Sequence, residues 1–171
     1  MLDTYKFIEK YKRISIIGME KNVGKTTLLN KLIADIGTNK KLGLTSIGRD
    51  GEDIDVVTNT DKPRIYVRRG SIIATGRNCL AKCDITKEIL YVTDFTTPMG
   101  SIVIVRALSD GYVDIAGPSY NKQVKIVVEL MEKFGSEISI VDGALGRKST
   151  AISDVSEATI LSTGAALSLD M

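Results

Sequence analysis

The chain has 171 residues, of which 43% are apolar and 26% are charged, and this length suffices for one well-buried α/β core. No stretch approaches the roughly 18 consecutive apolar residues of a membrane span, and charged side chains interrupt residues 1–13, which excludes the apolar core of a secretory signal. A net charge of +2 gives no electrostatic reason to expect a nucleic acid or a membrane as partner. We therefore expect one soluble domain that works in the cytoplasm.

The two cysteines, Cys79 and Cys83, lie four residues apart in a chain without histidine. One cysteine pair supplies only half of the ligands of a structural zinc site, and the spacing is not the CxxC of redox proteins. We therefore interpret both as structural thiols.

The predicted elements begin as a βαβ unit. A short amphipathic helix is predicted first, from apolar residues that recur every three positions: Leu2, Tyr5, Ile8 and Tyr11. Residues 13–18 form an apolar run typical of a buried strand, and residues 24–36 place leucine and isoleucine on one helical face, with Gly37 as the stop. Residues 42–47 predict a second strand, and the intervening helix favours its parallel pairing with the first.

The middle of the chain, residues 63–117, consists of short β-type runs separated by tight turns. The runs are residues 64–67, 71–75, 89–93, 102–107 and 112–115. Because a parallel crossover needs a dozen residues or more, the short connections predict antiparallel strands. We therefore predict an α/β fold with a parallel sheet and helices that carries a β-rich antiparallel insertion.

The α/β pattern resumes after Gly117. A helix is predicted through Phe134, a buried strand at residues 137–141, and a last strand at residues 158–161. A further helix opens at Thr163 and is too short to cover a sheet face within this sequence. We keep open that the sequence is a piece of a longer protein.

Residues 18–27, here called the phosphate loop, lie between the first strand and its helix. In such a loop backbone N–H groups converge on phosphate oxygens, a lysine reaches the β and γ phosphates, and a hydroxyl binds Mg²⁺. Gly24, Lys25 and Thr26 match these roles, whereas a Gly-Lys-Thr tripeptide in an arbitrary turn would lack the flanking strand and helix. The predicted nucleotide-binding residues are Gly18, Glu20, Lys21, Asn22, Val23, Gly24, Lys25, Thr26 and Thr27.

The glycine spacing of this loop departs from the usual one. Four residues between the glycines would require glycine at position 19, where the chain has Met19, and Gly18 comes one residue earlier. This variant resembles the loop of dethiobiotin synthetase and its relatives in the signal-recognition-particle/MinD-like class of P-loop proteins. The α/β fold is therefore predicted to be that of a P-loop NTPase.

Carboxylates follow two of the predicted strands, at the edge where open α/β sheets bind ligands. Asp142 ends an apolar strand before Gly143, and Asp50 opens an acidic loop whose alternative interpretation is simple solvation. We predict Lys25, Asp142 and Asp50 as catalytic, and Thr26, Asp142 and Asp50 as ligands of Mg²⁺. A guanine-binding Asn-Lys-x-Asp motif is missing, because Asn121 and Lys122 lack the following aspartate, and this favours ATP.

Several stretches together with the phosphate loop resemble the P-loop subunit of lysine 5,6-aminomutase reactivase: residues 42–52, 62–67, 73–75, 115–119 and 141–144. The resemblance covers most of residues 13–168. It implies an ATP-dependent factor that works with a second subunit to restore a cobalamin-dependent aminomutase whose cofactor has been damaged. It also implies that Arg49 and Asp50 are switch residues that report the nucleotide state.

Two other classes of function remain open at this point. A small-molecule ligase or kinase similar to dethiobiotin synthetase would need a substrate pocket, which no residues define. A nucleotide-binding scaffold would bind ATP without turnover. We expect a weak or partner-stimulated ATPase, with a partner surface in the β-rich middle near the exposed pair Arg68 and Arg69.

Overall fold

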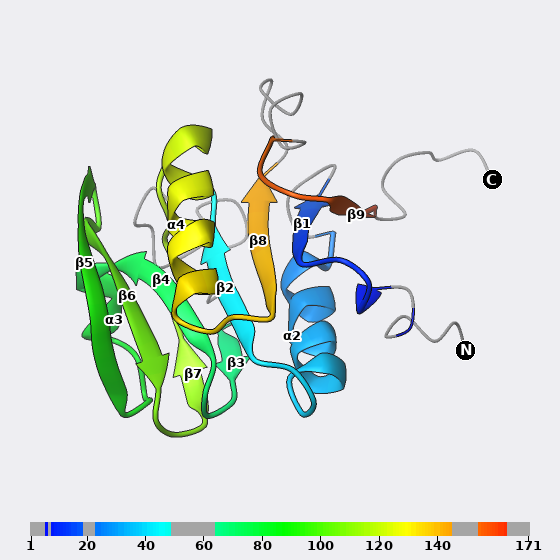
Figure 1. The fold of residues 1–171 in the computed structure, drawn as a ribbon, viewed down its shortest axis with the longest axis horizontal. Coiled ribbons are helices and arrows are strands. Elements are labelled where there is room, and N and C mark those ends of the chain that lie inside the picture. The colour runs from blue at the N-terminus through cyan, green and yellow to red at the C-terminus, as the bar shows by residue number, and fades with distance from the viewer. Residues whose placement is uncertain (1–5, 7, 19–22, 49–63, 145–153, 164–171) are drawn as a thin grey trace.

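The computed structural model describes residues 6, 8–18, 23–48, 64–144 and 154–163, and within them a seven-stranded sheet forms the centre (Figure 1). The strand order is β5-β6-β4-β2-β8-β1-β9. The strands are β1 (Arg13–Gly18), β2 (Leu42–Ser46), β4 (Ile72–Gly76), β5 (Lys87–Thr97), β6 (Gly100–Ala107), β8 (Ile138–Ala144) and β9 (Ala158–Ser162). The five strands from β4 to β9 in this order are parallel, and β6 is antiparallel to β4 and β5. The predicted α/β class is confirmed.

Two helices cover opposite faces of this sheet. The helix α2 (Lys25–Ile36) buries Leu29, Leu32, Ile33 and Ile36 against β1, β2 and β8 on one face. The helix α4 (Asn121–Lys133), in front of the sheet in Figure 1, buries Val124, Val127, Val128 and Met131 against the other face. Because both faces are covered, the central strands consist of nearly continuous apolar residues instead of an alternating pattern.

A salt bridge ties α4 to the central sheet. Arg13 at the start of β1 donates two hydrogen bonds to the carboxylate of Glu132, at 2.7 and 2.8 Å. Both side chains are less than a third exposed, and the hydrogen bond to Glu132 raises the pKa of the Arg13 guanidinium. The pair therefore fixes the end of α4 over the strand that leads into the phosphate loop.

A second, two-stranded sheet packs on the α2 side of the molecule. It consists of β3 (Ile65–Val67) and β7 (Gly111–Val113), which pair antiparallel. Their apolar residues join the core under α2. On the outer side the rings of Tyr66 and Tyr112 meet edge to face, with centroids 5.3 Å apart. Of all the predicted middle strands, only this pair lies outside the large sheet.

One predicted pairing is wrong, and the middle strands are not separate from the central sheet as predicted. β2 is parallel to β1 but not paired with it, because β8 lies between them. The antiparallel pairing predicted for the middle strands is confirmed for β4 with β6, for β5 with β6 and for β3 with β7. The middle is nevertheless not a separate insertion, because β4 pairs in parallel with β2 and so extends the central sheet. The prediction considered only the short connections within the middle segment, whereas the 25 residues between β2 and β4 allow a parallel crossover.

Some predicted elements differ in extent or lie outside the described residues. The short helix α3 (Arg77–Leu80) was not predicted, and β8 continues past residue 141, so Asp142 belongs to the strand. Half of the predicted N-terminal helix falls on residues outside the description. Of the described residues, Lys6 and Ile8 are helical, Ile8 is buried and Tyr11 packs against the core. The predicted C-terminal helix also lies outside the description. In the described ranges, no helix has the length and apolar character needed to cross a membrane.

Candidate nucleotide-binding site

The parallel strands end together at one edge of the sheet, and polar residues lie at those ends. Gly18, the last residue of β1, lies opposite Ala144 of β8 and Ser162 of β9. Asp142 of β8 lies opposite Ser46, the last residue of β2. β1 therefore has one neighbour that carries a carboxylate and another that carries a hydroxyl at the edge where ligands of α/β sheets bind.

The start of α2 has the features of an anion site. Gly24 has φ +80°, a left-handed conformation that glycine adopts without strain, and it is the N-cap residue of the helix. No described side chain caps this end, and the first turn contains no acidic residue. The first backbone N–H groups and the positive end of the helix dipole could therefore accept an anion without competition from a side chain of the described residues.

The side chain of Lys25 folds back over the end of β1. A Cβ atom added to Gly18 would lie 2.7 Å from Cδ and Nζ of Lys25, and 2.7 Å from Cγ2 of Val23. These distances are too short for any residue larger than glycine unless the neighbouring side chains move. Glycine at position 18 therefore has a steric reason, because it leaves room for the Lys25 ammonium at the sheet edge.

Two of the three predicted Mg²⁺ ligands lie within the residues that the structure describes. Thr26, in the first turn of α2, and Asp142, in β8, are both half-buried. The described residues contain no group of three or more cysteine, aspartate or glutamate side chains that could hold a metal. In phosphate sites Mg²⁺ uses one or two carboxylates together with phosphate oxygens and water, so a hydroxyl and one carboxylate fit this ion when a nucleotide is bound.

A segment from later in the chain runs along the ends of β4 and β2, and we call residues 115–118 the crossing segment. The N–H of Ala116 donates to Oγ1 of Thr75 at 2.9 Å, and the N–H of Gly117 donates to Oγ of Ser46 at 2.9 Å. The carbonyl of Pro118 accepts the N–H of Gly48 at 3.0 Å. Described parts of three stretches that carry the family resemblance, residues 42–48, 73–75 and 115–118, therefore meet at this edge.

The next residue of the loop after β2 contacts β8. The N–H of Ile47 donates to the carbonyl of Asp142 at 2.8 Å. Ile47 and Gly48, the two residues before Arg49, are thus held by hydrogen bonds to β8 and to the crossing segment. Arg49 and Asp50 lie outside the described residues, as do Glu20, Lys21 and Asn22, so their roles stay predictions.

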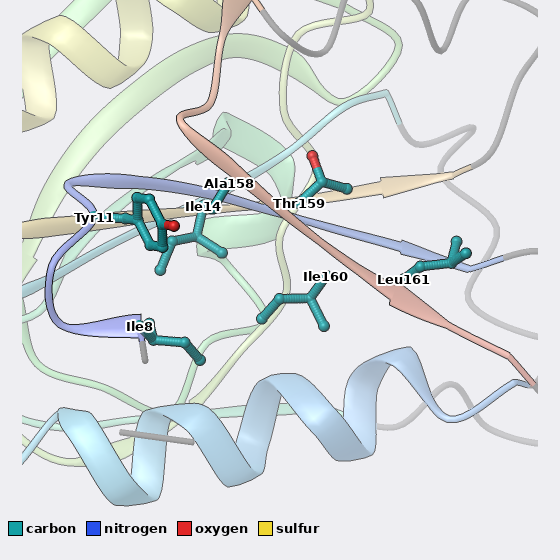
Figure 2. Close-up of a pocket in the computed structure, with 7 residues that line it drawn as sticks. All are labelled: Ile8, Tyr11, Ile14, Ala158, Thr159, Ile160 and Leu161. Atoms are coloured by element: carbon teal, nitrogen blue, oxygen red, sulfur yellow. The ribbon is translucent and has the colours of Figure 1, made fainter. Parts of the chain in front are cut away.

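A separate cavity of about 290 Å³ lies on the α2 side of β9 (Figure 2). It is lined by Ile8, Tyr11, Ile14, Ala158, Thr159, Ile160 and Leu161. None of these side chains is charged, so the cavity offers nothing that would neutralise a phosphate. This cavity is therefore not a candidate phosphate site.

The cysteines lie away from the phosphate loop, in and after α3. Cys79 is buried, and the half-buried thiol of Cys83 donates to the Cys79 carbonyl at 3.2 Å. Burial raises the pKa of the Cys83 thiol. A thiol with a raised pKa is a weak nucleophile at neutral pH, which agrees with a structural role.

Sequence reasoning missed the residues that fix the backbone around the site. Ser46 and Thr75 read as ordinary strand residues, and Ser162 gave no signal because its partner, the Val23 carbonyl, is 139 positions away. The chain matches no protein-family model, no curated protein and no solved structure.

Proposed function

We propose that the chain binds ATP together with Mg²⁺ at the phosphate loop. The observation that carries the proposal is the position of Lys25, whose side chain lies across Gly18 at the sheet edge, beside a helix N-terminus that no described side chain caps. A compact ammonium and a row of N–H groups together suit a chain of phosphates. The lack of a guanine-binding motif favours adenine.

Four described residues of the site have a definite part in this proposal. The N–H of Gly24 and those of the first turn of α2 bind phosphate oxygens, and the Lys25 ammonium neutralises the β and γ phosphates. Thr26 and Asp142 would hold Mg²⁺, which supplies charge neutralisation on the γ phosphate when bound. Asp142 is held by β-sheet pairing on both sides, so its backbone does not have to reorganise for this task.

The finer proposal is a partner-stimulated ATPase that reactivates a cobalamin-dependent lysine 5,6-aminomutase with a second subunit. Its support is the sequence resemblance, together with the meeting of three resembling stretches at the candidate site. Gly48, held by Pro118, leads directly into the proposed switch residues Arg49 and Asp50. Loss of the γ phosphate would release such a loop, and the partner would respond to the change.

The β-rich middle remains the proposed partner surface. Arg69 is exposed as predicted, but Arg68 is half-buried and its Nε atom is buried without a hydrogen-bond partner among the described residues. Arg68 therefore cannot serve as a purely surface probe. On β5 the apolar side chains Ile89, Tyr91 and Val92 are 64%, 46% and 54% exposed, and a partner would cover such residues.

Isothermal titration of the wild type and of Lys25→Ala with ATP and Mg²⁺ tests the binding proposal. We expect the variant to bind about tenfold to a hundredfold more weakly, because a hydrogen bond to a charged group is worth about 1.5–3 kcal/mol. Lys31→Ala is the matched control, since Lys31 lies on the same helix and pairs with Asp35 in solvent. Equal affinities of wild type and Lys25→Ala would refute the phosphate assignment.

Turnover assays separate the three classes of function. Phosphate release that rises with the aminomutase and second subunit supports the reactivase, and release that depends on a small substrate supports a ligase or kinase. Binding without release under any of these conditions supports the scaffold.

A further inference from the structure

The last residue of β9 is hydrogen-bonded to the phosphate loop. The hydroxyl of Ser162 donates to the carbonyl of Val23, the residue directly before Gly24. β9 pairs in parallel with β1, and Ser162 lies opposite Gly18, so the outer strand ends beside the loop. Figure 2 shows β9 running toward the start of α2.

This hydrogen bond fixes the orientation of one peptide group. In a planar trans peptide the C=O of Val23 and the N–H of Gly24 point in opposite directions. Because the carbonyl is directed at Ser162, the Gly24 N–H points away from β9. Gly24 itself offers little resistance to rotation of this peptide, since glycine with φ +80° tolerates conformations on both sides of the map.

We propose that Ser162 is a positioning residue, which holds the Val23–Gly24 peptide so that the Gly24 N–H faces the bound triphosphate. The inference rests on the proposed function, because it needs an anion at the loop. It adds that the outer strand β9 controls the shape of the phosphate site through one hydroxyl. Replacement of that hydroxyl by hydrogen frees the peptide to rotate, and the bound state must then pay for restraining it.

Two other roles of Ser162 make different predictions. A direct contact with the nucleoside would affect ATP but not inorganic triphosphate. If Ser162 only stabilised the edge of the sheet, its replacement by alanine would lower the stability of the fold. Replacement by threonine would then not restore the affinity for phosphate.

The experiment is isothermal titration of ATP and of inorganic triphosphate, each with Mg²⁺, into wild type, Ser162→Ala, Ser162→Thr and Thr159→Ala. Thr159 is the control because it lies on the same strand with an exposed side chain. We expect Ser162→Ala to bind both ligands about threefold to tenfold more weakly, the effect of one neutral hydrogen bond. Ser162→Thr and Thr159→Ala should bind like wild type, and all four thermal midpoints should be close.

Each outcome decides the inference. Wild-type affinity of Ser162→Ala for both ligands, while Lys25→Ala binds weakly, overturns the role of Ser162 and leaves the proposed function standing. The inference is also overturned if Ser162→Ala loses affinity for ATP but not for inorganic triphosphate. It is overturned as well if the loss of affinity accompanies a lowered thermal midpoint and Ser162→Thr shows the same loss. A wild-type protein that binds neither ligand overturns the proposed function and this inference together.

Discussion

Replacement of Gly18 by alanine tests whether the phosphate loop depends on the position of Lys25. The new Cβ would lie 2.7 Å from Cδ and Nζ of Lys25, about 0.7 Å short of an ordinary contact at 3.4 Å. Gly18 has no positive φ, so the backbone accepts alanine and the neighbouring side chains must move. The ammonium is the atom group at the free end, and we expect it to be displaced.

The size of the effect follows from Coulomb's law. At an effective dielectric constant of about 20, lengthening an ammonium–phosphate contact from about 3 Å by about 0.7 Å costs about 1 kcal/mol per unit charge. Titration of ATP with Mg²⁺ into Gly18→Ala should therefore show an affinity about fivefold to tenfold lower than that of the wild type. The unfolding free energy should fall by less than about 1 kcal/mol, because flexible side chains absorb the overlap.

Gly43→Ala is the matched control for this prediction. Its Cβ would lie 2.5 Å from Oγ of Ser136 and 2.9 Å from Oγ of Ser139, a comparable overlap in the first half of β2, away from the sheet edge. We expect it to lose about 1–3 kcal/mol of stability and to keep its affinity for ATP. Unchanged affinity of Gly18→Ala, or an equal loss in Gly43→Ala, would refute the reasoning.

Three further predictions concern other parts of the chain. Asp142→Asn should keep most of the ATP affinity and lose most of the turnover, and equal turnover in a preparation with measurable ATPase activity would remove Asp142 from the site. Arg69→Glu should fold and bind ATP normally but capture the partner subunit less well in a pull-down, and undiminished capture would place the partner surface elsewhere. Glu137 accepts a hydrogen bond from the Lys41 backbone N–H and another from the Lys40 side chain. The first of these, and to a smaller extent the second, lowers the pKa of Glu137 below the ordinary 4.5. A group with a lowered folded-state pKa stabilises above its unfolded pKa, and this contribution is lost as pH falls through the folded value. The wild type should therefore lose its stability advantage over Glu137→Gln in urea titrations as pH falls below 4.5, and a constant difference would contradict this.

The local elements could be predicted because apolar periodicity and glycine stops act over short distances. The helix α2 was predicted to within one residue of its observed start, and β1, β2 and β9 to within about one residue at each end. The order of the strands could not be predicted, because the insertion of β8 between β1 and β2 depends on packing between residues about a hundred positions apart. No local pattern encodes that choice.

The candidate site shows the same division between local and distant causes. Gly24, Lys25 and Thr26 form a contiguous motif whose chemistry can be recognised from the residues alone. The need for glycine at position 18 instead depends on the fold, because the folded chain brings the side chain of Lys25 over this residue. Likewise, a hydroxyl such as that of Ser46 acquires its meaning from the Gly117 N–H, 71 positions away.

Gly117→Ala tests whether the crossing segment is packed tightly on the end of β2. Its Cβ would lie 1.8 Å from the carbonyl oxygen of Ser46 and 2.8 Å from the carbonyl carbon, and both are backbone atoms that no rotamer can move aside. The segment must therefore leave the end of β2, and we expect a loss of about 3 kcal/mol or more in urea unfolding. Gly143→Ala is the control for stability, because among the described residues its Cβ would meet Ile47 and Ile16 at 3.6 and 3.7 Å, which are ordinary contacts. If both variants unfold at the same urea concentration, the crossing segment is not packed on β2 as described.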